Sequence, residues 1–397
     1  MNIVLGVCGS ISAYKTYELL RLYSKEDISV KVILTKGALN FVHANILKSL
    51  GALDVYTYGD DFKEIKDVNI LHIDLVKWMD KLVIAPASAN TIAKISSGVS
   101  DDLLTSVVLA ATQKEIHIYP AMNTQMLDNE ITQLNFKRLS KTKNTKIHDT
   151  QVGELACKDI GQGKLATVEY ILNSSTLASY GNKGIVTITT GATVAPLDTV
   201  RYLTNPSSGI TGIEIAKSFL KAGHKVNLIC GHNMQTKVQD FDNIQGLSLY
   251  HASTADKMLE LAQTCFEESD IYISAAAICD IKFQMQTSKI KKETLDGKLL
   301  YEKEVDILKT LSEVKTKQTI IGFAAESELN EDKLKDKMIS KKMDILIANI
   351  VNNGISSAQQ GFNQAANGYL IISNDSLRKN MTKKQLANFI VQKVEAL

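Results

Sequence analysis

A strand, a turn, a helix and a second strand occur in this order twice along the 397-residue chain. In the first half, the apolar run Asn2–Val7 leads through a glycine-serine turn and a helical pattern to a second strand at Val30–Leu34. In the second half, Gly184–Thr190 leads to a helix at about Ser208–Ala222 and a strand at Lys225–Cys230. A strand that returns through a helix to a parallel neighbour is a βαβ unit. The chain is therefore predicted to fold as two Rossmann-like, doubly wound α/β domains.

Both halves continue with further strands and helical patterns, which extend the two predicted sheets. These strands are expected at Lys81–Ala85, Glu115–Tyr119, Ile271–Ala276, Thr319–Phe323, Ile345–Ala348 and Tyr369–Ile372. We expect domains at residues 1–178 and 183–397, and a flap or hairpin in the Lys-, Glu- and Gly-rich stretch 287–303. Ligands of such sheets bind at the carboxyl ends of the strands, so both domains are predicted to have their sites there.

Composition excludes several classes of protein. Lys and Arg number 45 against 43 Asp and Glu, which gives a net charge of +2. The chain therefore has no overall excess of positive charge that would bind nucleic acid or a membrane surface. The five cysteines are scattered and form no C-x-x-C pair, which argues against a disulfide framework or a zinc site. No stretch reaches the 18 or so apolar residues that span a bilayer, and the opening MNIVLGVCGS lacks a signal-peptide pattern. We therefore expect a cytoplasmic protein.

Small and polar residues follow several strands of the first half. Gly9 and Ser10 follow the first strand, Thr35 follows the second, and Ser88 and Asn90 follow a later one. Backbone N–H groups and hydroxyls at such positions can bind an anion. Taken alone, Gly9 and Ser10 could equally form an ordinary turn, and Ser88 or Asn90 is better explained by capping of the next helix.

Two later segments decide between these interpretations. Pro120–Met126 reads P-A-M-N-T-Q-M and Gly153–Lys164 reads G-E-L-A-C-K-D-I-G-Q-G-K. Together with His72 they resemble the flavin-dependent cysteine decarboxylase family, over residues 1–177. Taken singly, His72 could be structural, Asn123 could close a turn and Cys157 could be an inert buried thiol.

The resemblance implies a bound FMN and a set of roles for individual residues. Asn123 belongs to the segment that holds the substrate carboxylate, His72 acts as a base or orienting group, and Cys157 donates a proton. FMN takes electrons from the substrate thiol and returns them, so that carbon dioxide leaves without net redox change. The residues implied in cofactor binding are Gly9, Ser10, Thr35, Ser88, Asn90 and Met122.

The second half resembles the ligase half of bifunctional coenzyme A biosynthesis proteins. The match begins with Thr190–Thr193, T-G-A-T, and continues through Pro196–Gly209, P-L-D-T-V-R-Y-L-T-N-P-S-S-G. It implies that residues 207–209 present N–H groups to the phosphate of 4'-phosphopantothenate. It also implies that Asn205 acts around the reacting carboxylate and the acyl-cytidylate, although a turn asparagine explains that residue equally well without the match.

Further segments resemble the nucleotide-binding part of the same ligase. They are Ser274–Asp280, S-A-A-A-I-C-D, and the K-I-K-K flap that begins at Lys289. The resemblance implies that Lys289 stabilises charge on the carboxyl group and the α-phosphate, and that Asp280 also holds Mg²⁺. Lys337 and Lys341 are expected on one face of one helix, being four residues apart. The implied CTP pocket comprises Ser274, Ala275, Ala276, Asp280, Phe323, Lys337 and Lys341.

The resemblance implies one function for the whole chain. The second domain condenses 4'-phosphopantothenate with cysteine, using CTP, to give phosphopantothenoylcysteine, and the first decarboxylates this product to 4'-phosphopantetheine. Trimeric decarboxylase and dimeric ligase contacts would make the protein a homo-oligomer. Two alternatives are a flavin-binding regulatory subunit and a chain with one active half. The sequence departs from the family pattern at Leu127, Lys158, Lys164, Ile350 and Ala365.

Overall fold

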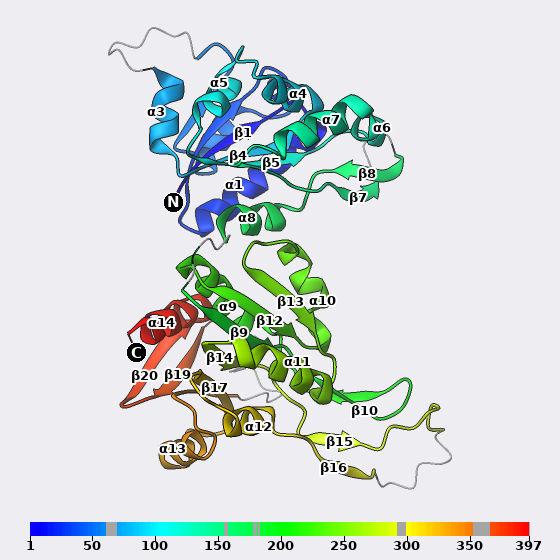
Figure 1. Cartoon of the computed structure of the whole chain (residues 1–397), viewed down its shortest axis with the longest axis vertical. Helices are drawn as coiled ribbons and strands as arrows, with labels where there is room; N and C mark the ends of the chain where they lie inside the picture. The colour runs from blue at the N-terminus through cyan, green and yellow to red at the C-terminus, as the bar shows by residue number, and fades with distance from the viewer. Residues whose placement is uncertain are drawn as a thin grey trace. The chain divides into compact units, whose positions relative to one another are not determined.

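The chain forms two compact units, Met1–Thr176 and Leu177–Leu397 (Figure 1). The computed structural model describes residues 1–60, 70–154, 158–177, 181, 183–291, 299–351 and 366–396. Each unit has its own sheet and its own hydrophobic core. The predicted α/β fold with parallel sheets is confirmed in both units.

The first unit is built on a six-stranded sheet in the order β3-β2-β1-β4-β5-β6, in which every pair is parallel. The central strands are buried almost throughout because helices cover both faces. The strands are β1 (Asn2–Val7), β2 (Ser29–Leu34), β3 (Asp54–Tyr56), β4 (Lys81–Ala87), β5 (Glu115–Pro120) and β6 (Thr145–Ile147).

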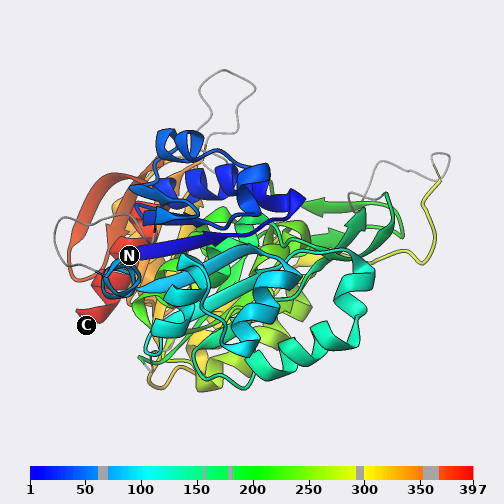
Figure 2. The ribbon, with the colours of Figure 1, turned by 90° about the horizontal axis from the view of Figure 1, so that it is seen from above.

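Helices pack on both faces of this sheet, as the two views show (Figures 1 and 2). One face is covered by α1 (Thr16–Lys25), α2 (Ala44–Ser49) and α8 (Val168–Thr176). The other is covered by α3 (Leu71–Trp78), α4 (Ala89–Ser97), α5 (Leu103–Ala110) and α7 (Glu130–Leu139). The short helix α6 (Thr124–Asp128) follows β5, and an antiparallel hairpin of β7 (Gln151–Glu154) and β8 (Ile160–Lys164) follows β6.

The second unit has an eight-stranded sheet in the order β13-β12-β9-β14-β17-β18-β19-β20. The first six of these strands are parallel, whereas β19 pairs antiparallel with both β18 and β20. The strands are β9 (Ile185–Thr190), β12 (Lys225–Cys230), β13 (Leu247–His251), β14 (Ile271–Ser274), β17 (Thr319–Glu326), β18 (Ile345–Ile350), β19 (Ala366–Ile372) and β20 (Ser376–Thr382). The sequence did not indicate β20, because this edge strand exposes most of its polar side chains and has no apolar run.

Helices cover both faces of the second sheet as well. The helices α9 (Ile210–Ala222) and α14 (Lys383–Glu395) share one core cluster on one face. On the other face, α11 (Ala255–Glu268), α12 (Ile307–Glu313) and α13 (Glu331–Ser340) share another.

Two antiparallel ribbons complete the second unit. They are formed by β10 (Val194–Pro196) with β11 (Tyr202–Thr204), and by β15 (Ile281–Phe283) with β16 (Tyr301–Lys303). The first of them lies between β9 and α9 along the chain. The predicted flap at 287–303 falls between β15 and the end of β16, with residues 292–298 outside the described part. Among the described helices, none has both the length and the apolar character needed to cross a membrane.

Candidate active sites

The residues predicted to bind FMN all follow strands that are neighbours in the first sheet. Because β2, β1, β4 and β5 lie side by side and run parallel, their carboxyl ends form one edge. Gly9 and Ser10 follow β1, Thr35 follows β2, Ser88 and Asn90 follow β4, and Met122 follows β5. The sheet order therefore brings these six positions to one edge.

Close backbone packing positions the first two of these turns. A Cβ on Gly9 would lie 2.9 Å from the backbone carbon of Gly37, so the turns after β1 and β2 approach more closely than a side chain would allow. Thr35 donates both its N–H, at 3.1 Å, and its hydroxyl, at 3.2 Å, to the carbonyl of Val7. Ser10 precedes a helical turn but makes no side-chain capping hydrogen bond. Hydroxyls and close backbone at this edge are a donor set that fits a phosphate group.

Ser88 has the capping role that the sequence left open. Its hydroxyl accepts a hydrogen bond from the N–H of Thr91 at 3.4 Å, which makes it the N-cap of α4. Asn90 is exposed in the first turn of the same helix. Both residues lie at the predicted edge, and their contact with a flavin stays a prediction.

The two segments that carried the decarboxylase resemblance contact each other. Met122 donates its N–H to the carbonyl of Gly163 at 3.0 Å, and the hydroxyl of Thr124 donates to the carbonyl of Gln162 at 2.6 Å. Asn123 is the N-cap of α6, and its Oδ1 accepts from the N–H of Gln125 at 2.9 Å. The hairpin β7–β8 is thereby attached to the turn after β5.

Of the other two predicted catalytic residues of this unit, the structure describes His72 but not Cys157. Cys157 lies outside the described residues, and Lys158 after it has φ +69°, a conformation that favours glycine. His72 is half-buried in the first turn of α3. Because α3 ends just before β4 begins, its first turn lies toward the carboxyl edge of the sheet.

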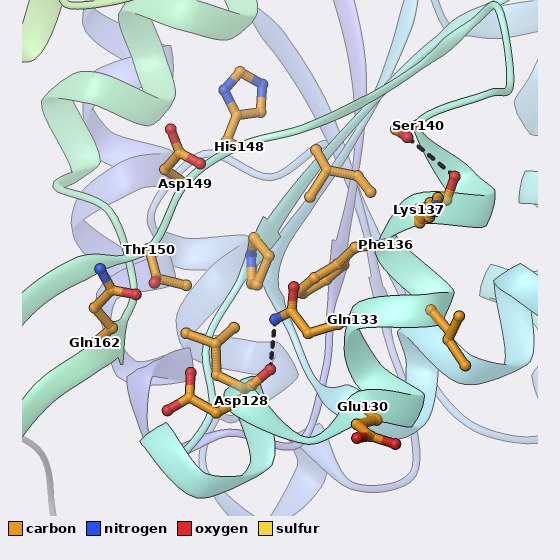
Figure 3. A pocket seen from close by; sticks show the side chains of 14 residues that line it. Asp128, Glu130, Gln133, Phe136, Lys137, Ser140, His148, Asp149, Thr150 and Gln162 are labelled. Carbon is orange, nitrogen blue, oxygen red and sulfur yellow. Dashed lines mark hydrogen bonds between the residues drawn. The ribbon is translucent and has the colours of Figure 1, made fainter.

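A pocket of about 830 Å³ lies between α7 and the segment after β6, and the sequence did not indicate it (Figure 3). Phe136 and Gln133 line one side, and His148 and Thr150 line the other. The side chain of Gln133 donates to the carbonyl of Leu127 at 2.6 Å. None of the six residues predicted to bind FMN lines this pocket.

The second unit has a pocket of about 550 Å³ at the carboxyl ends of its parallel strands. It is lined by every predicted ligase residue except Lys289. These residues are Asn205, Ser274, Ala275, Ala276, Asp280, Phe323, Lys337 and Lys341. Segments that are far apart in the sequence thus form one concave site.

Glycines bring the start of α9 close to β9 beside this pocket. A Cβ on Gly212 would overlap the side chain of Thr190, whose hydroxyl donates to the carbonyl of Gly209 at 2.8 Å. Gly209 has φ +71° and is the N-cap of the helix, which therefore begins at Ile210. The helix was predicted to begin at about Ser208 and begins two residues later, after the left-handed turn at Gly209, which glycine accepts readily. Ser208 still lines the pocket next to the helix start.

Hydrogen bonds also fix the residues opposite α9. The amide nitrogen of Asn205 donates to the carbonyl of Ile278 at 2.9 Å, so this side chain ties the loop after β11 to the segment after β14. Ala275 donates its N–H to the carbonyl of Thr189 at 3.1 Å. Alanines here leave room for a ligand next to the strand ends.

Lysines and carboxylates alternate along the far side of the pocket. Lys337 Nζ lies 3.0 Å from Glu326, and Lys341 Nζ lies 2.8 Å from Asp306. Lys341 is the C-cap of α13, so it lies one residue beyond the helix on which it was predicted to lie with Lys337. Asp280 is exposed at the rim. Within the described residues, no three His, Cys, Asp or Glu side chains gather as a metal site.

Lys289 is exposed in the segment after β15 and does not line the pocket. Its neighbour Ile290 donates its N–H to Asp198 at 3.1 Å, and its carbonyl accepts from Arg201 at 3.0 Å. The guanidinium of Arg201 lies 2.5 Å from the carboxylate of Asp198 and holds the pKa of that carboxyl well below its usual range. An ion pair between the buried Asp198 and the half-buried Arg201 thus anchors the segment that carries Lys289.

Several pocket residues at the last strands of the sheet were not predicted from the sequence. They include Asn349 at the end of β18, Tyr369 on β19 and Lys383 at the start of α14. The T-x-x-Q pattern Thr382–Gln385 is a capping signal that could have located the start of α14. Its place beside the pocket depends on β20, which the sequence did not indicate.

Comparisons with known proteins agree with both resemblances. The Flavoprotein family model matches residues 1–178, and the model of the DNA/pantothenate metabolism flavoprotein C-terminal domain matches residues 182–397. The coenzyme A biosynthesis bifunctional protein CoaBC of Bacillus subtilis is 34% identical over 100% of this chain and 97% of its own length. The protein of the same name from Haemophilus influenzae is 35% identical over 89% of this chain and 87% of its own. A crystal structure of the C-terminal domain of a CoaBC protein has 27% identity, covers 56% of this chain and 97% of its own, and gives a TM-score of 0.42. This chain belongs to the family of bifunctional coenzyme A biosynthesis proteins.

Proposed function

We propose that the two halves catalyse consecutive steps of coenzyme A biosynthesis. Residues 183–397 condense 4'-phosphopantothenate with cysteine at the expense of CTP, and residues 1–178 decarboxylate the resulting phosphopantothenoylcysteine to 4'-phosphopantetheine. The observation that carries this proposal is the pocket of the second unit, which gathers predicted ligase residues from four separate segments, in a chain that matches a relative over its whole length.

The ligase half must activate a carboxylate, because an amine does not displace oxide from a free carboxylate at neutral pH. Transfer of CMP to the carboxylate, with loss of pyrophosphate, gives a good leaving group, and the amino group of cysteine then forms the amide. Asn205, fixed by its bond to Ile278, would orient the carboxylate. Lys337 and Lys341 would offset phosphate charge, and Asp280 with phosphate oxygens would hold Mg²⁺. Lys289 would reach the reacting centre from its anchored segment.

The decarboxylase half needs an electron sink, and a bound FMN supplies one by exchanging electrons with the substrate thiol. The turns that carry Gly9, Ser10 and Thr35 would hold its phosphate. Asn123 would bind the substrate carboxylate next to the hairpin β7–β8. Cys157, which lies between β7 and β8 in the sequence, would return a proton to the product, and His72 would orient the substrate.

We also infer assembly into homo-oligomers. Several large apolar side chains of the two ribbons of the second unit are exposed, among them Tyr202, Leu203, Leu300 and Tyr301. A partner subunit would bury this apolar surface.

Nucleotide choice and flavin content test the two halves separately. With 4'-phosphopantothenate and cysteine, pyrophosphate release should be faster with CTP than with ATP, and purified protein should have the absorbance spectrum of FMN. Equal or faster turnover with ATP would contradict the CTP assignment and direct attention to Ile350, where the sequence departs from the family pattern. Colourless protein that takes up no added FMN would contradict the decarboxylase assignment.

A further inference from the structure

Asp198 is a buried carboxylate in the turn 197–201, which joins β10 to β11 and does not line the pocket of the second unit. One of its oxygens accepts hydrogen bonds from the N–H groups of Val200 and Arg201, both at 2.8 Å. The other accepts from the guanidinium of Arg201, from Nε at 3.0 Å, and from the N–H of Ile290 at 3.1 Å. Burial of a carboxylate costs free energy, and these charge-assisted bonds offset that cost. Asp198 therefore fixes its own turn and the segment that contributes Ile290.

The residue next to Lys289 is held to this turn through both of its backbone polar groups. Ile290 donates its N–H to Asp198, and its carbonyl accepts from the guanidinium of Arg201 at 3.0 Å. Arg201 thus binds the carboxylate and the peptide of Ile290 at the same time, which the planar fork of a guanidinium allows. The backbone at Lys289 is therefore positioned by the contact of its neighbour with Asp198 and Arg201.

A second contact holds the start of the same segment. The strands β10 and β15 pack against each other, as Figure 1 shows, and Gln286 after β15 donates its N–H to the carbonyl of Leu197 at 3.1 Å. Residues 287–289 lie between this bond and the bonds to Ile290, and all three are exposed. The turn 197–201 therefore holds this exposed stretch from both ends.

The same turn leads along the chain to Asn205. The strand β11 follows Arg201 directly and ends one residue before Asn205, whose amide nitrogen donates to the carbonyl of Ile278 at 2.9 Å. The turn around Asp198 is thus attached on one side to the residue proposed to orient the reacting carboxylate. On the other side it is attached to the segment that carries Lys289.

We propose that Asp198 is a positioning residue of the ligase, which sets the place of Lys289 relative to Asn205 during transfer of CMP. This inference rests on the proposed function of the second unit. In that step a carboxylate oxygen of 4'-phosphopantothenate bonds to the α-phosphorus of CTP, while the bond to pyrophosphate breaks and its electron pair leaves with pyrophosphate. Lys289 stabilises the charge of this transition state only if its ammonium group is correctly placed. Displacement of such a group by about 1 Å can lower the rate by about 10²-fold.

Steady-state kinetics of the full chain test this role with Asp198→Asn, which keeps the size of the side chain and removes its charge. The kcat of pyrophosphate release should fall about 10- to 100-fold, without falling below that of Lys289→Ala. The KM values for CTP and 4'-phosphopantothenate should stay within about threefold, because the lost interaction is made in the transition state. Arg201→Lys should lose less kcat, since it keeps the charge but not the fork that reaches both Asp198 and Ile290.

A double-mutant cycle separates positioning from a general structural role. Because Asp198 acts through Lys289, Asp198→Asn should change kcat by less than about twofold in the Lys289→Ala background. A structural role would lower kcat by the same factor in both backgrounds, and it would lower Tm in parallel.

An exposed ion pair on the same ribbon provides a matched control. Asp256 lies 2.6 Å from Lys282 of β15, and both side chains are exposed, so Asp256→Asn should leave kcat unchanged. Wild-type kcat in folded Asp198→Asn, or an undiminished effect in the Lys289→Ala background, would overturn the inference. Arg201→Lys decides by the same cycle if Asp198→Asn does not fold. If the wild-type protein released no pyrophosphate from CTP, the proposed function itself would fail.

Discussion

Gly163 lies where the hairpin β7–β8 meets the segment after β5. Its φ is +118°, and a Cβ at this position would overlap the carbonyl oxygen of Met122. At the same place, the N–H of Met122 donates a hydrogen bond to the carbonyl of Gly163. Only glycine combines this backbone conformation with so close an approach. The position of Asn123, one residue after Met122, therefore depends on Gly163.

Gly163→Ala should abolish most decarboxylation, because displacement of a substrate-binding turn by about 1 Å can lower the rate by about 10²-fold. The assay is carbon dioxide release from supplied phosphopantothenoylcysteine, with pyrophosphate release by the ligase as the internal reference. Gly98→Ala is the matched control, since Gly98 also has positive φ, +72°, but has nothing within 4 Å of an added Cβ. Wild-type decarboxylation by Gly163→Ala would show that the contact is not needed.

Individual pocket residues differ in how well the sequence predicted them. Asn205 and Asp280 were predicted from short motifs, and both line the pocket, because each motif lies within one segment. Lys383 was missed because its relation to the pocket depends on the pairing of β19 with β20, which is a property of the fold and not of any local pattern.

At the scale of elements, β5, β6 and α8 are joined by a buried polar cluster. His117 of β5 and His148 after β6 lie 3.0 Å apart, from Nδ1 to Nε2, and His148 also lies 3.1 Å from the hydroxyl of Tyr170. The ring of His148 stacks on Tyr119 with centroids 4.1 Å apart. Burial lowers the pKa of His117 and lowers that of His148 to about 3. Both rings are therefore neutral in the folded unit at neutral pH.

This cluster should make the first unit acid-sensitive. As pH falls below about 6.5, the histidines of the unfolded chain take up protons while those of the folded unit stay neutral, so the free energy of unfolding falls. The slope should reach about 1.4 kcal/mol per pH unit for each buried histidine. The fluorescence of Trp78, the only tryptophan of the chain, reports denaturant unfolding of this unit alone.

Substitution of single histidines shows how much each of them contributes to this pH dependence of the unfolding free energy. His148→Phe keeps a ring on Tyr119 and should remove about one histidine's share of the slope, whereas the exposed His43→Gln should leave it unchanged. An unfolding free energy of the wild-type unit that does not vary between pH 7 and pH 5 would contradict the account.

Elements differ in how well the sequence predicted them. Buried parallel strands such as β12 were predicted to the residue, because continuous apolar runs end sharply at polar turns. The ribbons β10–β11 and β15–β16 and the strand β20 were not resolved as strands in the sequence, because exposed strands have no apolar run to mark them. The ends of α9 and α13 were misjudged by one or two residues, as is usual for helix termini.

At the scale of the whole molecule, each unit has its own sheet, its own core and its own candidate site. The predicted residues of each reaction lie within one unit, with Asn123 and His72 in the first and Asn205 and Asp280 in the second. Two sites on two separately packed units should be removable one at a time.

The most direct test identifies products by mass after incubation of full-length protein with 4'-phosphopantothenate, cysteine, CTP and Mg²⁺. The wild-type protein should give 4'-phosphopantetheine. Cys157→Ala should accumulate phosphopantothenoylcysteine or an oxidised product, because loss of the proton donor slows the first unit by roughly 10²- to 10⁴-fold. Lys289→Ala should form the amide roughly 10²- to 10³-fold more slowly but still decarboxylate supplied phosphopantothenoylcysteine. Loss of both reactions from either folded variant, or absence of 4'-phosphopantetheine from the wild-type reaction, would contradict the account.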